Sequence, residues 1–313
     1  MHLPHVNVAF PMITRDTFPL RRIWPKTYKR LLVLLAFDCA VAGLYTFLDW
    51  HWLSIEALPL AQLGSALTIF LAFRANAAYG RWWEARQLWG SLVNTSRAIA
   101  RQALTALDVD PTDPRQSSLR DDIVVHQVAF VHALRCHLRR QNPFPELTGL
   151  LGQARADALR GYANIPHALT LRLGQQLQQA RDWGMLDSLR WSALDANLTT
   201  LANIQGACER IKNTPLPRQF SSLPRTLVNM YCWLVPLGLI AGMGLAMPIA
   251  SVLISFTLIA IDSASSAIED PFENTVHDTP MTALSRGIEL TLREMLGQRV
   301  ALREVRAIDG FIY

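Results

Sequence analysis

Four apolar stretches constrain the fold of this chain more than any other feature, because each approaches the length that a membrane-spanning helix requires. That length is about 20 residues, with a range of roughly 17 to 25. The first stretch contains one charge, Asp38, and the second and fourth are rich in Ser, Ala, Thr and Gly, which suit helices packed against protein or lining a pore. The sequence therefore predicts four transmembrane helices, at residues 31–48, 57–73, 227–247 and 248–268.

The composition agrees with part of the chain lying in lipid. Half of the 313 residues are hydrophobic and 18% are charged, compared with about 25% charged residues in soluble domains. The net charge of +5 comes from 27 Arg and only 3 Lys, which cluster beside the apolar stretches. This clustering is typical of membrane topology rather than of a nucleic-acid surface. We therefore expect membrane lipids as partners and no nucleic acid.

The placement of Arg and Lys also orients the helices. Six of these residues precede the first helix, none lies in the link at residues 49–56, and 18 Arg with one Lys lie between residues 74 and 225. Both termini are thus expected in the cytosol, and no cleavable signal peptide is visible before residue 31. The expected organisation is a cytosolic segment at 1–30, transmembrane helices at 31–73, a cytosolic helical region at 74–225, transmembrane helices at 226–268 and a cytosolic helix and tail at 269–313.

The stretches outside the membrane are expected to be helical, because no alternating strand pattern of useful length occurs in them. The second transmembrane helix should continue well past residue 73, since no Pro interrupts it. A last helix is expected from Pro280 to about Arg303, with Thr279 as its N-cap. The other expected helices lie at about 116–141, 147–160, 166–182 and 186–212. The fold class is therefore all-α.

Enzyme motifs and metal-binding patterns are missing from the sequence. The glycine-rich nucleotide-binding motifs, HExxH and GxSxG do not occur. His126 and His137 would share one helix face but lie about 16 Å apart by helical rise, which is too far for one metal ion. The four cysteines show no CxxC spacing. We expect neither an enzyme nor a cofactor nor a metal site.

Ser65, Ile69 and Phe73 follow one another at intervals of four residues, and therefore form one stripe on a helix. Packing within the protein is the simpler explanation of such a stripe. Its small and polar neighbours, however, make this face poor for lipid and tolerable beside water. If several copies of the helix surrounded an axis, Ile69 and Phe73 would form apolar rings able to gate ions by dewetting.

Acidic residues occur at two places in the apolar stretches. Asp38 can carry a proton or pair with a neighbouring helix, and pairing is favoured because burial of a lone charge is costly. Asp262, Glu269 and Asp270 close the fourth stretch and are expected near the inner interface, where water reaches them.

Three blocks of the sequence resemble the bestrophin family, specifically its prokaryotic branch. They read "FRANAAYGRWWEARQLWG" at residues 73–90, "CERIKNTPLP" before the third apolar stretch, and "EDPFENTVHDTPMTALSRGIELTLREMLG" after the fourth. Together with the order of the apolar stretches, the resemblance spans nearly all of residues 15–300. In the first block we expect the arginines at phosphate headgroups and the tryptophans between subunits or at the interface.

The resemblance implies a homopentameric ion channel with four membrane helices per subunit, a helical cytosolic region and one central pore. It places the hydrophobic neck of the pore at Ser65, Ile69 and Phe73. The family favours bulky apolar residues at all three positions, so Ser65 implies a neck that is one ring shorter. The narrow cytosolic aperture falls on Leu189, with Met185 as the fallback.

The resemblance further implies permeating monovalent ions, with cations favoured over anions, and a bacterial inner membrane. Calcium gating of the animal type is not expected, because "ENTVHD" at residues 273–278 contains only Glu273 and Asp278 as acidic residues, and Ca²⁺ requires six to eight oxygen ligands. The alternatives are an anion-selective channel, a proton- or sodium-coupled transporter that uses Asp38 or Asp262, and a membrane scaffold that binds a soluble partner.

Overall fold

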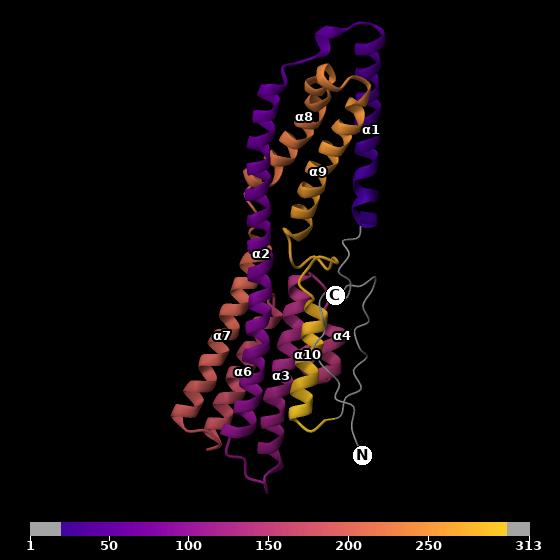
Figure 1. The fold of residues 1–313 in the computed structure, drawn as a ribbon. Helices are drawn as coiled ribbons and strands as arrows, with labels where there is room; N and C mark the ends of the chain where they lie inside the picture. Colours follow the sequence, from indigo (N-terminus) through magenta and orange to yellow (C-terminus); the bar gives the residue numbers. More distant parts are fainter. Residues whose placement is uncertain (1–19, 299–313) are drawn as a thin grey trace, which may run out of the picture. The chain divides into compact units, whose positions relative to one another are not determined.

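The computed structural model describes residues 20–298, and its regular elements are all helices (Figure 1). The prediction of an all-α fold is confirmed for this part of the chain. The α-helices are α1 (Leu20–Phe47), α2 (Ala57–Ala106), α3 (Pro114–Leu138), α4 (Phe144–Leu151), α5 (Gln153–Asp157), α6 (Ile165–Asp182), α7 (Ser188–Asn213), α8 (Arg218–Met243), α9 (Met247–Ile268) and α10 (Met281–Met295).

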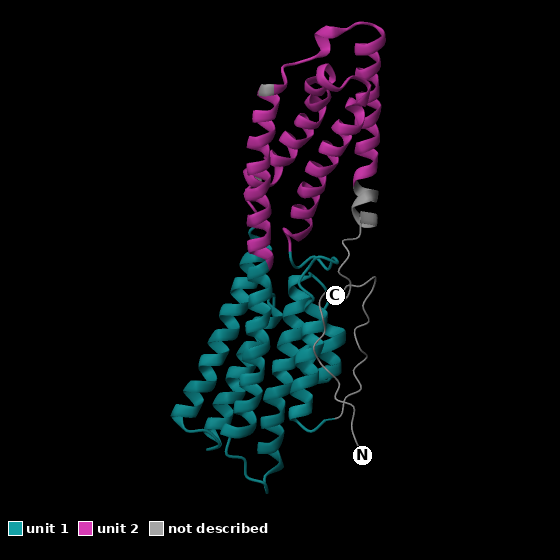
Figure 2. Cartoon of the chain, viewed as in Figure 1, with its two compact units in different colours: residues 1–15, 83–214, 271–313 teal, residues 16–82, 215–270 magenta. Residues whose placement is uncertain are grey.

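The chain divides into two compact units, coloured separately in Figure 2. Within the described residues, unit 1 comprises 83–214 and 271–298, and unit 2 comprises 20–82 and 215–270. The 50-residue helix α2 contributes its first half to unit 2 and its second half to unit 1. As predicted, this helix continues far past residue 73.

Unit 2 contains α1, α8 and α9, which contact one another, and the first half of α2. Among the described residues, the segments long and apolar enough to cross a membrane are Thr27–Phe47 and Gln219–Ile268. The second segment is the antiparallel pair α8 and α9, joined by a short turn in which Gly244 has a φ of 52°. The first half of α2 is not among these segments, and its passage through the membrane stays a prediction.

Unit 1 is a helical bundle in which α3 contacts α4, α6, α7 and α10. Local sequence signals fix where its helices begin. Asp113, Asn164 and Asp187 are the N-caps of α3, α6 and α7, and each side chain accepts a hydrogen bond from a main-chain N–H of the first turn. One continuous hydrophobic cluster fills the bundle.

Two predicted helices have different bounds in the structure. The helix expected at 147–160 is split into α4 and α5, because Gly152 adopts a φ of 83° between them. The last helix has Pro280, not Thr279, as its N-cap, and it ends at Met295 because Gly297 has a φ of 72°. The predicted end at Arg303 lies outside the described residues.

Candidate functional site: the exposed face of α2 and its charged neighbours

The stripe predicted from the sequence lies on an exposed face of α2. The side chains of Ile69 and Phe73 are 56% and 62% exposed in the single chain, and Ser65 is also exposed. Leu67 and Leu71 point the other way and are buried in unit 2. The stripe therefore faces away from the core of its own subunit.

Two hydroxyls on this part of α2 are satisfied within the helix. The Ser65 hydroxyl donates to the Ala61 carbonyl oxygen at 3.0 Å, and the Thr68 hydroxyl donates to the Gly64 carbonyl oxygen at 2.9 Å. Such bonds to the preceding turn leave few unmet hydrogen-bonding groups on the exposed face. The face consequently suits an apolar constriction better than a site that binds an ion tightly.

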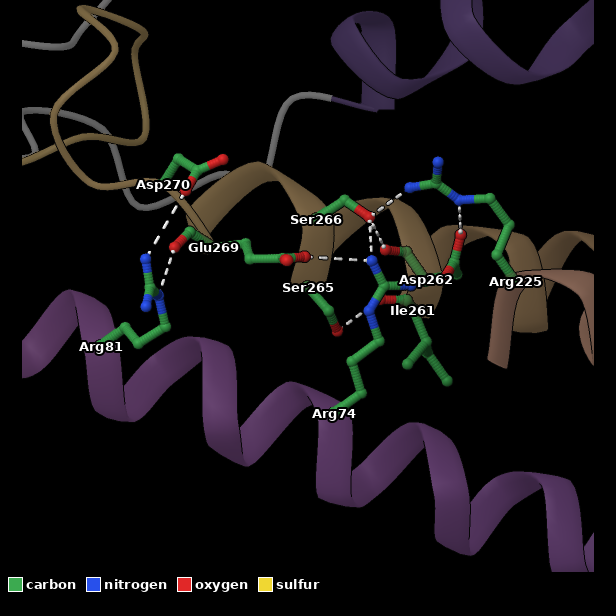
Figure 3. A network of polar contacts seen from close by, with 9 residues as sticks. All are labelled: Arg74, Arg81, Arg225, Ile261, Asp262, Ser265, Ser266, Glu269 and Asp270. Carbon is green, nitrogen blue, oxygen red and sulfur yellow. Dashed lines mark hydrogen bonds and ion pairs between the residues drawn. The ribbon is translucent and has the colours of Figure 1, made fainter. Parts of the chain in front are cut away.

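Arg74 follows Phe73 directly and enters a charged cluster within unit 2 (Figure 3). Its guanidinium group pairs with the Asp262 carboxylate, lies 3.2 Å from a Glu269 oxygen, and donates to the Ser266 hydroxyl at 2.8 Å. Arg225 adds a second contact to Asp262, with 3.4 Å between Nε and Oδ2. Arg81 lies 3.7 Å from the Asp270 carboxylate and donates to the Glu269 carbonyl oxygen at 3.0 Å.

The structure corrects two expectations for the block at residues 73–90. Arg74 is 1% exposed, so it pairs with carboxylates inside the protein and not with phosphate headgroups. Trp89 is fully buried in the hydrophobic cluster of unit 1, so it lies neither between subunits nor at the membrane interface. Three arginines therefore face three carboxylates, which balances the charge. The arginines are Arg74, Arg81 and Arg225, and the carboxylates are Asp262, Glu269 and Asp270.

The two aperture candidates differ sharply in exposure. Leu189, in the first turn of α7, is 81% exposed, whereas Met185 is 1% exposed and belongs to the core of unit 1. A side chain buried within its own subunit cannot line a passage. The fallback assignment to Met185 is therefore wrong, and Leu189 stays a prediction.

A buried charged cluster in unit 1 was not anticipated from the sequence. The two ring nitrogens of His132 lie 3.0 Å from a Glu146 oxygen and 2.9 Å from a Glu289 oxygen. Burial lowers the pKa of His132, but the hydrogen bonds to both glutamates more than offset it, so the pKa is raised. Burial likewise raises the pKa of Glu146, but the hydrogen bonds from His132 and Arg135 outweigh it and lower this pKa to about 2. This cluster joins α3, α4 and α10.

The acidic residues of "ENTVHD" are engaged with protein groups. A Glu273 oxygen lies 2.5 Å from Lys212 Nζ, and Asp278 accepts hydrogen bonds from the Thr275 N–H at 2.9 Å and the Thr275 hydroxyl at 2.5 Å. Burial raises the pKa of Asp278, although its hydrogen bonds act in the opposite direction. Within residues 20–298, no group of three or more His, Cys, Asp or Glu residues could hold a metal ion.

Asp38 is fully buried in unit 2 and lies beside Ser251 of α9. It therefore faces a neighbouring helix, as expected. Neither carboxylate oxygen meets the geometry of a hydrogen bond among the described residues, so structural pairing stays a prediction.

Comparison with known proteins agrees with this architecture. Residues 16–294 match the model of the bacterial and fungal bestrophin proteins. The chain is 34% identical to the voltage-dependent anion channel-forming protein of Ralstonia nicotianae over 93% of both chains, and 32% identical to YneE of Escherichia coli over 86% of both. A crystal structure of a bacterial bestrophin homologue from Klebsiella pneumoniae superposes with a TM-score of 0.81 at 30% identity, covering 87% of this chain and 99% of that one.

The fold and these relatives define a membrane channel protein rather than an enzyme. The chain belongs to the bestrophin family, in its bacterial and fungal branch. The resemblance recognised in the sequence is thereby confirmed.

Proposed function

We propose that five copies of this chain form an ion channel with one central pore in a bacterial inner membrane, both termini lying in the cytosol. Ile69 and Phe73 of each subunit form two apolar rings, and Ser65 forms a polar ring next to them. Leu189 forms the narrow aperture on the cytosolic side. The helices expected to cross the membrane are α1, the first half of α2, α8 and α9.

One observation carries this proposal. Two large apolar side chains, Ile69 and Phe73, lie one turn apart on the exposed face of α2, while Leu67, Leu71 and Arg74 fix the opposite face to the subunit. A rigidly held helix presents these side chains in a constant direction. Rings of such side chains constrict a pore and control its wetting.

For selectivity, we propose that the pore favours monovalent cations. Arg74 is the positive charge nearest to the neck in sequence, but it is buried and paired with Asp262 and Glu269. It therefore adds no cationic ring to the exposed face of α2. The alternative is an anion-selective pore, and the names of the relatives from Ralstonia nicotianae and Escherichia coli favour it.

The test of the neck is single-channel recording in planar bilayers with purified protein. We expect Phe73→Ala and Ile69→Ala to raise the open probability or conductance, because each removes an apolar ring that resists wetting. Phe70→Ala is the matched control: Phe70 is 51% exposed on the same helix but points about 100° away from Ile69 and about 60° away from Phe73. If Phe70→Ala changes the current and the other two do not, the assigned neck is wrong.

Two further measurements address assembly and selectivity. Native mass spectrometry is expected to give five times the chain mass of 35.1 kDa. Reversal potentials in asymmetric NaCl and KCl then separate cation from anion permeation. Coupled, saturable flux without unitary currents would favour the transporter alternative.

A further inference from the structure

We propose that unit 2 contains a binding site for a dehydrated monovalent cation of the size of Na⁺. Its ligands are the Asp38 carboxylate of α1, the hydroxyls of Ser251 and Ser255 in α9, and the main-chain carbonyl of Cys232 in α8. The site lies within one chain and is separate from the stripe on α2. It therefore stands or falls independently of the proposed pore.

Asp38 occupies the middle of an apolar span. It lies 11 residues from one end of the segment Thr27–Phe47 and 9 from the other, which corresponds to about 16 Å and 14 Å of helix. The carboxylate is fully buried, and no Arg or Lys of the described residues pairs with it. A carboxylate at such a depth requires a counter-charge or a proton.

Ser251 and Ser255 supply two more oxygens on one face of α9. Both are fully buried, and neither hydroxyl makes a hydrogen bond within the described part of the chain. This is unusual for the chain: the hydroxyls of Thr257 and Ser265 on the same helix donate to carbonyls one turn earlier. Ser251 and Ser255 instead have free lone pairs in the interior of the bundle.

These groups are neighbours. Ser251 lies beside the Asp38 carboxylate, although the geometry of a hydrogen bond is not met. Ser255 lies beside the Cys232 thiol, which is also within electrostatic reach of Asp38. At the same level, the rings of Phe37 and Trp233 meet edge-on with centroids 4.8 Å apart, which joins α1 to α8.

Pro236 provides the fourth oxygen. This residue lies inside α8 and has no N–H, so the carbonyl four residues earlier, that of Cys232, loses its helical hydrogen bond. Freed carbonyls of this kind coordinate Na⁺ in membrane helices. Cys232 is 1% exposed, and its carbonyl therefore has little access to water.

Apolar side chains close the site on both sides. The core of unit 2 is divided into two hydrophobic clusters: one includes Leu34 and Leu258, and the other includes Val41 and Met247. Asp38, Ser251 and Ser255 fall between these clusters along α1 and α9. A cation held there exchanges its water for oxygen ligands of the protein, which hard cations prefer.

The depth of the carboxylate favours a cation as its counter-charge. The carboxylate neutralises the charge of the cation, and the two hydroxyl oxygens and the freed carbonyl complete its coordination. Because serine hydroxyls also donate, a proton on Asp38 is the competing occupant. The titratable neighbour of Asp38 in the described residues is the Cys232 thiol.

The test is thermal unfolding of the purified full-length protein in lipid nanodiscs. The midpoint is measured in NaCl and in N-methyl-D-glucamine chloride at equal ionic strength and pH. We expect Na⁺ to raise the midpoint of wild type by about 5 °C, because a ligand that binds the native state stabilises it. Asp38→Asn should abolish this response, and Ser251→Ala or Ser255→Ala should increase the Na⁺ concentration needed for half of it by about tenfold or more.

Ser265→Ala is the matched control, because Ser265 is a buried serine of α9 that donates to the Ile261 carbonyl. Its Na⁺ response should equal that of wild type. A midpoint that depends on pH but not on Na⁺ would assign Asp38 to a proton and overturn the proposal, as would an unchanged Na⁺ response in Asp38→Asn. If Asp38→Asn does not fold, binding of radioactive Na⁺ decides: Ser251→Ala and Ser255→Ala must bind it more weakly than both Ser265→Ala and Phe73→Ala.

Discussion

The two units of the chain place their apolar side chains differently. In unit 1, Trp89 and Phe130 are fully buried in one continuous cluster. In unit 2, the core consists of two small clusters, while Phe47, Ile249 and Leu253 are 65% to 76% exposed. The hydrophobic effect explains how unit 1 is assembled. It cannot explain unit 2 in a bilayer, because lipid tails are as apolar as the side chains.

Polar contacts and close packing must therefore define unit 2. Its buried arginine, Arg74, reaches Asp262 and Glu269 across the sequence, and Gly64 allows Tyr231 to approach α2 closely. Unit 1 also buries charges, around His132, but a large apolar core surrounds them. We therefore expect a lost polar contact to cost more stability in unit 2 than in unit 1.

The largest effect is expected for Asp262→Ala. It leaves the buried Arg74 without its main partner, and breaking a buried ion pair costs about 3–5 kcal/mol. The free energy of unfolding in detergent measures this loss. Asp157→Ala in unit 1 is the control, because its pair with Arg160 (2.6 Å) is exposed and such pairs contribute about 0–1 kcal/mol.

Removal of both charges separates pairing from packing. The double variant Arg74→Leu, Asp262→Leu should recover much of the stability lost in Asp262→Ala, since apolar residues of similar volume can replace a buried pair. Equal losses for Asp262→Ala and Asp157→Ala would contradict the special role of polar contacts in unit 2.

The same difference explains what the sequence could predict. The positions of the helices followed from periodicity, Pro and N-cap residues, and the exposed stripe at Ser65, Ile69 and Phe73 followed from its spacing. These are local signals along one helix. The N-cap of α10 is Pro280 and not the predicted Thr279, and the helix ends at Met295 because of main-chain geometry at Gly297 that the apolar pattern does not contain.

Contacts between residues far apart in the chain could not be predicted from the sequence. Arg74 and Asp262 are 188 residues apart, and the ring of His132 meets Glu289 across 157 residues. Each residue alone reads as an ordinary charge near a membrane or on a helix. Asp38 was flagged from its apolar surroundings, but only the structure brings it beside Ser251 and leaves both without a hydrogen bond.

The next effect concerns the pH dependence of unit 1. The pKa of His132 is raised above its ordinary value of 6.5, so its contribution is complete below about pH 6.5 and is lost as the pH rises through the folded pKa. The pKa of Glu146 is lowered from 4.5 to about 2, so its contribution is complete above about pH 4.5 and is lost as the pH falls toward 2. Stability from this cluster should therefore be greatest between about pH 4.5 and 6.5.

His132→Asn tests this window. At pH 6 it should cost about 1–3 kcal/mol, because the buried Glu289 and the partly exposed Glu146 lose a charged hydrogen-bond partner. The unfolding midpoint of the variant should also decline less than that of wild type between pH 6 and 9. His167→Asn, at an exposed position of α6, should keep the wild-type profile. Identical profiles for wild type and His132→Asn would show that the charged cluster does not determine how the stability of unit 1 depends on pH.

The smallest effect distinguishes packing from helix propensity in unit 2. A Cβ atom at Gly64 would clash with the Tyr231 hydroxyl oxygen and lie 2.8 Å from Cζ, so the ring must move, whereas a Cβ at Gly43 meets nothing within 4 Å. We expect Gly64→Ala to cost about 1–3 kcal/mol from overpacking and Gly43→Ala to stabilise by about 0.5–1 kcal/mol. Tyr231→Leu should restore tolerance of Gly64→Ala. Both substitutions add the same methyl group to a helix of unit 2, so opposite signs can arise only from the approach of α8 to α2, and equal signs would show that close packing does not define this unit.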